Sequence, residues 1–179
     1  MNNIVLIGLP GSGKSTLGVI LAKTLGFRFI DTDIVIQEHT GKLLQDIIDN
    51  SGVNDFLKVE EACILSLECI HTVIATGGSV VYSIRAMQHL KSDGITIYLE
   101  ISFDEMVKRL KNIITRGVVL EPGQNLRDMY DQRIPLYEKY ADIRVDCSDE
   151  AFEIVVEKVI MKIRENNGLL CDMKQDQST

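Results

Sequence analysis

The chain has few of the residue types on which metal sites and disulfide-stabilised domains depend. Its 179 residues include no tryptophan, three prolines, three histidines and four cysteines. No two cysteines form a Cys-x-x-Cys pair and the histidines lie far apart, so the sequence favours neither a zinc site nor a catalytic histidine. We expect four reduced thiols in or near the core, at Cys63, Cys69, Cys147 and Cys171.

Positive charge and long apolar runs are also scarce. Nineteen lysines and arginines against 26 acidic residues give a net charge of −7, whereas nucleic-acid affinity comes largely from neutralising phosphates. No apolar run approaches the length of a membrane span, and the N-terminus lacks the pattern of a signal peptide. We therefore expect a cytoplasmic protein that binds neither nucleic acid nor membranes, and we expect it to be a monomer.

The most informative feature that is present lies between Gly8 and Ser15, where Gly-Leu-Pro-Gly-Ser-Gly-Lys-Ser matches every fixed position of a phosphate-binding P-loop. A buried strand is predicted before it, over 4–7, and a helix after it, over 16–25. Glycines let backbone N–H groups turn toward a polyphosphate, Lys14 reaches the β- and γ-phosphates, and Ser15 ligates Mg²⁺. The flanking strand and helix argue against a chance glycine-rich turn. The predicted nucleotide-binding residues of this loop are Gly11, Ser12, Gly13, Lys14, Ser15 and Thr16.

The rest of the chain alternates between strand and helix patterns, which is typical of a parallel sheet covered by helices on both faces. We expect one three-layer α/β domain over 1–167 and a disordered tail over 168–179. The further predicted strands are 27–31, 72–76, 95–99 and 143–146. The further predicted helices are 33–50 with an interruption near Gly41, 53–69, 83–90, 102–111, 126–140 with a kink or break near Pro135, and one that starts at 148. Residues 112–123 have no periodicity and are predicted to form a short mobile lid.

Two aspartates follow the second predicted strand, at the edge of the sheet where ligands bind in open α/β folds. In an extended segment alternate residues point the same way, so Asp31 and Asp33 are expected to face one site. One would hold Mg²⁺ through water, and the other would accept or orient a substrate hydroxyl. The alternative is a turn that caps the following helix.

Glycines and arginines supply the remaining candidates. Thr76-Gly77-Gly78-Ser79 follows the third predicted strand and allows close approach of backbone to a ligand, although paired glycines also make ordinary turns. Arg109 and Arg116 flank the start of the predicted lid, where an arginine can stabilise the charge of a transferring phosphoryl group. Arg133 can bind a carboxylate through its planar fork, although a surface role is the commoner outcome for any single arginine.

Together these motifs resemble the shikimate kinase family, within the P-loop proteins that are similar to nucleoside monophosphate kinases. The resemblance covers about residues 3–165 and implies a five-stranded parallel sheet in the order 2-3-1-4-5. It also implies ATP- and Mg²⁺-dependent conversion of shikimate, a small-molecule substrate, to shikimate 3-phosphate for aromatic amino-acid biosynthesis. The implied catalytic residues are Lys14, Asp33 and Arg116. Arg109 would lie near the adenine, Ser15 and Asp31 would serve the metal, and the acceptor would lie within about 33–62 and against Gly77, Gly78, Ser79 and Arg133.

Three motifs depart from the family pattern. Leu57 stands where the family has an arginine that holds the substrate carboxylate, and Ser79 replaces the third of three glycines. In the lid, Arg116 is followed by Gly-Val-Val in place of Pro-Leu-Leu. These differences leave two alternatives open. One is a related kinase for another hydroxy acid, a sugar acid or a nucleoside monophosphate, and the other is a nucleotide-binding protein with little catalysis.

Overall fold

The computed structural model describes residues 3–111, 118–121, 123–148 and 151–175, with side chains as far as Asn166. Five parallel strands form one sheet in the order β2-β3-β1-β4-β5, which confirms the predicted fold and strand order. They are β1 (Asn3–Ile7), β2 (Arg28–Asp31), β3 (Thr72–Ala75), β4 (Gly94–Glu100) and β5 (Ile143–Asp146).

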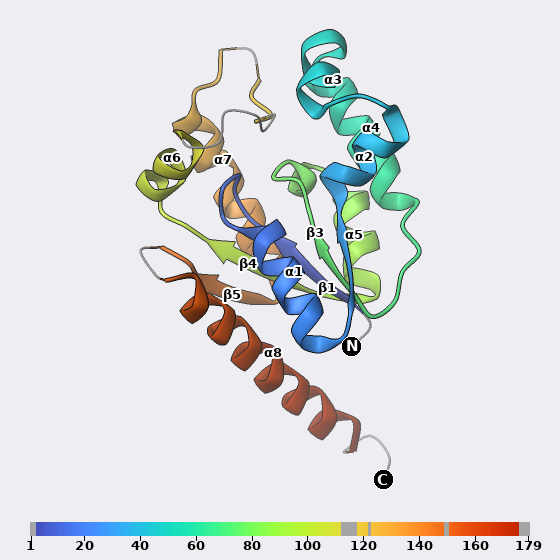
Figure 1. Cartoon of the computed structure of the whole chain (residues 1–179), viewed down its shortest axis with the longest axis vertical. Helices are drawn as coiled ribbons and strands as arrows, with labels where there is room; N and C mark the ends of the chain where they lie inside the picture. Colours follow the sequence, from blue (N-terminus) through green and yellow to red (C-terminus); the bar gives the residue numbers. More distant parts are fainter. Residues whose placement is uncertain (1–2, 112–117, 122, 149–150, 176–179) are drawn as a thin grey trace.

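Helices cover both faces of this sheet. In Figure 1, α1 and α8 lie on one face, and α5 and α7 lie on the other. The second, third and fourth helices form a separate group beside β2 and β3, and the 3-10 helix η1 packs between α5 and α7. The helices are α1 (Lys14–Leu25), α2 (Thr32–Thr40), α3 (Leu44–Ser51), α4 (Val53–Leu65), η1 (Val80–Tyr82), α5 (Ile84–Ser92), α6 (Phe103–Lys111), α7 (Leu126–Tyr140) and α8 (Phe152–Gln175).

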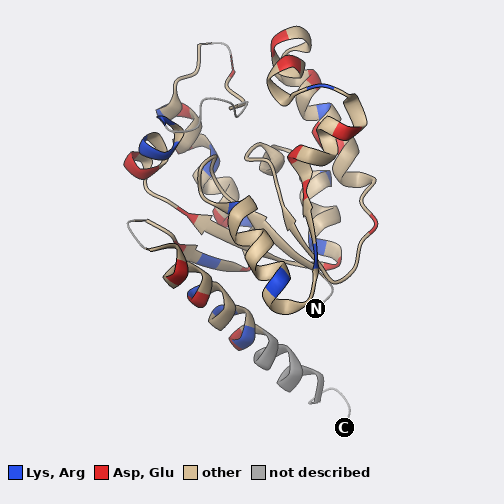
Figure 2. Cartoon of the chain, in the orientation of Figure 1, with Lys and Arg blue, Asp and Glu red and all other residues tan. Residues whose placement is uncertain are grey.

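The main core lies on both faces of the sheet, which explains why the inner strands β1, β3 and β4 are mostly apolar. The edge strands β2 and β5 each carry an arginine and an aspartate. Ile4, Val5, Leu6 and Ile7 of β1 are all fully buried, because β1 is the central strand. A second, smaller cluster joins α2, α3 and α4 around Ile36, Ile47 and Phe56. In Figure 2 the red positions of Asp and Glu recur along these three helices, and Glu38, Asp46, Asp49 and Asp55 are exposed. The helical group therefore has its own apolar interior and an acidic exterior.

Several predicted helix boundaries are confirmed by the groups that cap them. Gly41 adopts φ 66° at the end of α2 and separates it from α3, as the sequence predicts. The hydroxyl of Ser102 accepts a hydrogen bond from the Glu105 amide at 3.2 Å at the start of α6. Cys63, Cys69 and Cys147 are free thiols, whereas Cys171 lies outside the residues whose side chains are described.

Three segments differ from the predictions. The fourth helix ends at Leu65, short of Cys69, because the chain must turn into β3. The α7 helix runs through Pro135 as one element, with buried side chains on both sides of the proline. The last helix continues to Gln175, into the predicted disordered tail, where 168–175 contain no proline to stop it. No helix within the described ranges is both long enough and apolar enough to cross a membrane.

Candidate active site

The P-loop joins β1 to α1 at the carboxyl edge of the sheet. Gly13 is the N-cap of α1 and has φ 92°, a conformation that side chains other than glycine adopt only with strain. At Gly8, φ is 149° and a Cβ would lie 2.6 Å from the carbonyl oxygen of Leu99. Both glycines are therefore required, and the loop leads directly into a helix N-terminus that favours anions.

The ammonium group of Lys14 lies inside this loop. Its Nζ donates hydrogen bonds to the carbonyl oxygens of Gly8 at 2.8 Å and Leu9 at 2.9 Å, and it lies 3.4 Å from Ser12 Oγ. The side chain is 6% exposed. A buried cation at the start of a helix, inside a loop of backbone amides, is suited to receive phosphate oxygens.

The three residues of the Asp31-Thr32-Asp33 segment each make a different contact. Asp31 caps α2, because its Oδ1 accepts a hydrogen bond of 3.0 Å from the Asp33 amide. The buried hydroxyl of Thr32 accepts a bond of 3.0 Å from the amide of Gly77. Asp33 lines the cavity that Lys14 and Ser15 also line, whereas Asp31 does not. Because α2 begins at Thr32, the extended alternation stops before Asp33 and does not by itself point both carboxylates to one side. The shared role of Asp31 and Asp33 stays a prediction.

The loop after β3 is held from three directions. The Thr76 hydroxyl donates a hydrogen bond of 2.9 Å to the Leu6 carbonyl of β1. The amide of Gly77 donates a hydrogen bond to the Thr32 hydroxyl of α2. The Tyr137 hydroxyl of α7 donates a hydrogen bond of 2.6 Å to the Gly78 carbonyl. These bonds place the loop against the P-loop, where Gly77, Gly78 and Ser79 all line the shared cavity.

Arg133 supplies a second buried cation at this cavity. The residue is 1% exposed, its Nε donates to the Tyr82 hydroxyl at 3.1 Å, and its Nη2 donates to the Val119 carbonyl at 2.6 Å. Its guanidinium also lies 5.2 Å from the centre of the Tyr82 ring. Within the described part of the chain no carboxylate forms a salt bridge with it, although its charge acts on the buried carboxyl group of Glu60.

Arg109 joins α6 to the P-loop and to the end of β5. It donates hydrogen bonds to Glu105 at 2.7 Å, to the Gly11 carbonyl at 3.2 Å and to the Cys147 carbonyl at 3.1 Å. The structure therefore brings Arg109, which the resemblance places near the adenine, into contact with both the P-loop and the Cys147 loop. Arg116 lies outside the described residues, as does most of the predicted lid.

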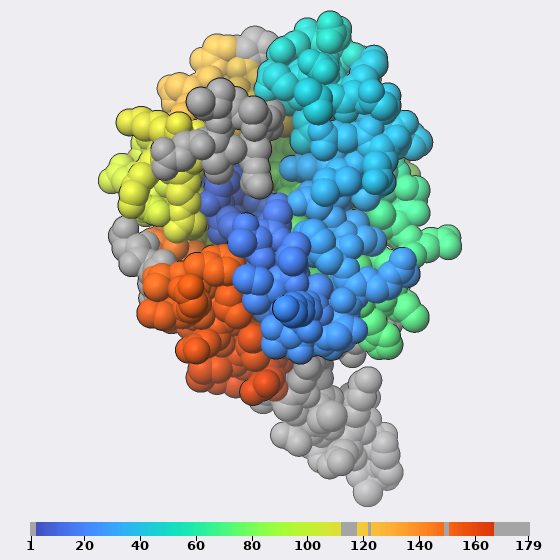
Figure 3. All heavy atoms as spheres, viewed as in Figure 1, coloured from blue at the N-terminus to red at the C-terminus, as the bar shows by residue number. Residues whose placement is uncertain are grey.

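The cavity on which these groups converge is small, about 40 Å³. That volume is close to the roughly 30 Å³ that one water molecule occupies in the liquid. Leu44 of α3 and Val119, from the described part of the predicted lid, cover it together with Phe56. In Figure 3, α2 and α3 stand on one side of the P-loop end of α1, and α6 stands on the other. An acceptor molecule therefore requires the covering segments to move apart.

Sequence reasoning missed four residues that shape this cavity: Pro10, Thr32, Tyr82 and Val119. The position of Thr32 between Asp31 and Asp33, two predicted site residues, could have indicated that it lies at the site. Tyr82 and Val119 had no such signal, because they lie 51 and 14 residues, respectively, from Arg133, which each of them contacts.

The altered Phe56-to-Glu60 element contributes to the wall behind the cavity. Leu57 is half-buried, packs against the second apolar cluster and does not line the cavity that contains Lys14. The neighbouring Lys58 forms an exposed ion pair with Asp55 at 2.8 Å. Neither residue brings a cation to the cavity, so Lys14 and Arg133 are the cationic side chains among its described lining residues.

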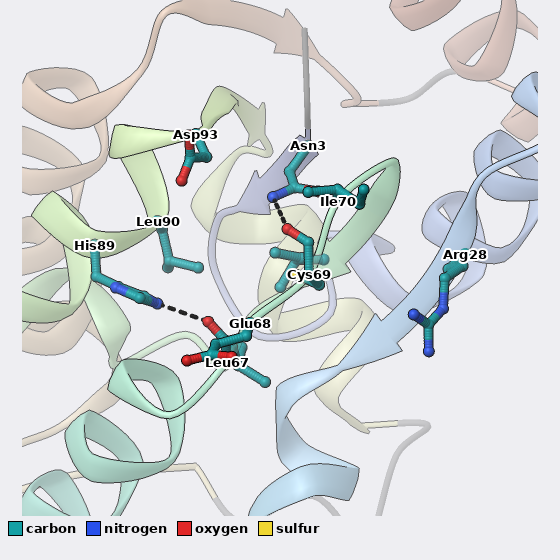
Figure 4. A pocket seen from close by; sticks show the side chains of 10 residues that line it. Asn3, Arg28, Leu67, Glu68, Cys69, Ile70, His89, Leu90 and Asp93 are labelled. Carbon is teal, nitrogen blue, oxygen red and sulfur yellow. Dashed lines mark hydrogen bonds between the residues drawn. The ribbon is translucent and has the colours of Figure 1, made fainter.

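A larger cavity of about 460 Å³ lies near the amino ends of the strands, away from the P-loop (Figure 4). Its wall is held by hydrogen bonds from Asn3 to the Cys69 carbonyl at 2.8 Å and between His89 and the Leu67 carbonyl at 2.9 Å. Glu68 and Asp93 line it, and carboxylates repel phosphate groups. Arg28 and His89 also line it, but none of its described lining residues belongs to the P-loop, so the cavity at the P-loop is the candidate nucleotide site.

Comparisons with known proteins agree with this geometry. The family model for shikimate kinase matches residues 10–164. A shikimate kinase from Thermodesulfovibrio yellowstonii is 40% identical over 172 residues, which cover 94% of this chain and 99% of the relative. The structure of Acinetobacter baumannii shikimate kinase in complex with shikimate superposes with a TM-score of 0.83 at 30% identity, covering 93% of this chain and 94% of the other.

A more distant likeness concerns the fold alone. Thymidylate kinase from Candida albicans superposes with a TM-score of 0.62 at 14% identity, over 93% of this chain and 92% of the other. The shared fold is that of P-loop kinases, as the resemblance implied. With a matching family model over most of its length and a relative at 40% identity, the chain belongs to the shikimate kinase family.

Proposed function

We propose that this chain transfers the γ-phosphoryl group of ATP to a hydroxyl of shikimate, giving shikimate 3-phosphate. The observation that carries the proposal is that Lys14, Asp33 and Arg133 line one cavity at the carboxyl edge of the sheet. A phosphate-binding cation, a carboxylate able to accept a hydroxyl proton and a second cation able to bind an acceptor anion are thus gathered in one place.

On the nucleotide side, the P-loop amides and Lys14 bind the phosphate oxygens, with Gly11, Ser12, Gly13 and Thr16 as part of the same loop and helix start. Binding requires Lys14 to exchange at least one of its contacts with Gly8, Leu9 or Ser12 for a phosphate oxygen. We expect Arg109 and the Cys147 loop to border the adenine, an expectation supported by the bonds that Arg109 makes to the P-loop and to the Cys147 carbonyl.

On the acceptor side, Arg133 binds the carboxylate, and the backbone of Gly77, Gly78 and Ser79 lies against the ring. Asp33 orients the reacting hydroxyl and takes its proton as the new P–O bond forms. Arg116 remains a candidate for charge stabilisation on lid closure. Most of the rate enhancement comes from positioning and from fixed positive charge.

Mg²⁺ belongs to this proposal as the ion that accompanies ATP. Ser15 lines the cavity next to Lys14, and Asp31 uses only one carboxylate oxygen in its capping bond to the Asp33 amide. Hydroxyl and carboxylate oxygens are the donors that Mg²⁺ prefers, so these residues fit the ion, with Asp31 acting through water. When bound, the ion neutralises phosphate charge. The expectation of a cytoplasmic monomer stays a prediction.

The test is a coupled assay of ADP release with ATP and Mg²⁺, run with shikimate, with a sugar acid, with a nucleoside monophosphate and with no acceptor. We expect turnover that depends on shikimate in the native protein and its loss in Lys14→Met. Turnover with another acceptor alone would assign a different substrate. Repeating the assay with Leu57→Arg tests the altered motif: activity that requires this change would show that Arg133 alone does not hold the shikimate carboxylate.

A further inference from the structure

Glu60 is a buried carboxyl group whose surroundings the proposed reaction does not explain. It lies on α4 and is 2% exposed, and its Oε1 has no hydrogen-bond partner among the described groups. This oxygen packs against Gly77, on the side where a Cβ would project. Asp33 Oδ1 lies 3.0 Å from the same Cβ position, so two carboxylates converge on one glycine beside the acceptor cavity.

The groups that face Glu60 come from four parts of the chain. The Ser79 hydroxyl forms a hydrogen bond with its carboxyl group and stabilises the ionised form. Burial opposes ionisation most strongly, and the nearby Asp33 charge adds to that effect. Together they raise the pKa of Glu60 to about 7. The titratable or charged groups around it are Asp33 on α2, Arg133 and Tyr137 on α7, and Cys63 on its own helix.

The attraction between Glu60 and Arg133 has a consequence for the acceptor. Neither Leu57 nor the exposed Lys58 offers Glu60 a cation from its own helix. Arg133 Nη1 lies 3.1 Å from the Cβ position of Gly78, next to the glycine against which Glu60 packs. Arg133 is therefore the described cation that acts on Glu60, and it is also the cation proposed to hold the acceptor carboxylate. A negative charge on Glu60 reduces the positive potential that Arg133 presents to the cavity.

We propose that Glu60 determines the affinity for the acceptor by competing with the acceptor carboxylate for the charge of Arg133, and that Ser79 sets the pH at which this competition begins. The proposal rests on the proposed function, because it takes the acceptor to be a carboxylate held by Arg133. Below the pH at which Glu60 ionises, Glu60 is neutral and the charge of Arg133 acts on the acceptor carboxylate without competition from Glu60. Above it, Glu60 is ionised and the anionic acceptor binds more weakly.

The experiment measures shikimate KM at saturating ATP and Mg²⁺ from pH 6 to pH 8.5, with shikimate binding measured by calorimetry without nucleotide. We expect KM to rise about 5- to 10-fold across this range in the native protein, a common size for coupling between two sites. In Glu60→Gln we expect a KM that changes little with pH and is lower than the native value at pH 8.5. In Ser79→Ala the rise should move to higher pH, because a bond that stabilises ionised Glu60 is lost.

Glu61→Gln is the matched control, since it removes the same charge one residue along the helix. Glu61 binds Arg85 and Ser83 and does not face Arg133, so its pH profile should follow the native one. Shikimate methyl ester, which lacks the carboxylate charge, should show no pH-dependent loss of affinity. The measurement with the methyl ester distinguishes competition for Arg133 from a general effect of pH on the site.

Parallel pH profiles for the native protein and Glu60→Gln would overturn the proposal while leaving the proposed function intact. An unchanged transition in Ser79→Ala would do the same for the role of Ser79, and this variant keeps the test available if Glu60→Gln does not fold. Absence of shikimate binding and turnover in the native protein at every pH would instead overturn the proposed function, and this inference with it.

Discussion

Tyr137 donates a hydrogen bond of 2.6 Å to the carbonyl oxygen of Gly78, one turn of α7 beyond Arg133. Residues four apart lie on the same face of a helix. One face of α7 therefore holds the backbone of the acceptor loop with its tyrosine and presents a cation to the cavity with its arginine. The bond joins segments 59 residues apart, so it connects the position of the loop to the packing of α7.

Replacing Tyr137 with phenylalanine should raise shikimate KM and leave ATP KM nearly unchanged. The Gly78 carbonyl would lose its buried donor, at a cost of about 1–3 kcal/mol in the free energy of unfolding. Urea denaturation and initial rates check the two effects. Tyr130→Phe is the control, because its hydroxyl bonds the Ile101 carbonyl at 3.3 Å, away from this loop. Equal changes in both variants would argue against a role for the Tyr137 bond in acceptor binding.

Replacing Arg109 with glutamine should weaken ATP binding by about tenfold, as the loss of charged hydrogen bonds that order the P-loop predicts. The shikimate KM should stay within about twofold, since Arg109 contacts only the nucleotide side. A calorimetric titration with ATP measures the change in ATP affinity. Lys108→Gln removes a neighbouring positive charge that is exposed on the surface, and it should bind ATP like the native chain. A normal ATP affinity in Arg109→Gln would remove this residue from the nucleotide site.

The fold was predictable because its signals are local. Each buried strand is a short apolar run, and glycines such as Gly26 and Gly41 mark helix ends. The end of α4 was not predictable in the same way, since apolar residues continue past Leu65 into the turn. His71, just before β3, adopts φ 50°, a conformation that its residue type does not signal.

The site was predictable where its residues are contiguous and not where distant segments meet. The eight residues from Gly8 to Ser15 include the glycines of the loop and Lys14, so the sequence alone predicts that this segment binds phosphate. The separation of Asp31 from the cavity depends on the residue at which α2 begins, and helix boundaries are the least certain part of a pattern. Glu60 is buried against Gly77 because of how α4 packs against the loop after β3. Such packing between distant segments cannot be predicted from the spacing of residues in the sequence.

The buried Glu60 should make the protein less stable as pH rises from about 4.5 to about 7. Its folded pKa, about 7, lies above the ordinary value of 4.5, so within this window the folded state keeps a proton that the unfolded state loses. The loss should be on the order of 3 kcal/mol in the free energy of unfolding. Urea denaturation at several pH values measures it. Glu60→Gln should flatten this part of the curve relative to Glu61→Gln, and identical curves for these two variants would contradict the assignment.

Replacing Asp33 with asparagine tests the chemical step itself. The amide keeps the size and hydrogen-bonding reach of the carboxylate and cannot take a proton, so kcat should fall by about 100-fold or more. ATP affinity should change little, because the bonds by which Arg109 joins the P-loop to β5 do not involve Asp33. Stopped-assay turnover and ATP calorimetry on the same preparation give both quantities. Asp46→Asn, on the exposed side of α3, supplies the matched charge change and should retain native turnover. If Asp33→Asn loses turnover and ATP affinity to the same extent, the carboxylate serves nucleotide binding and another group must receive the proton of the acceptor hydroxyl.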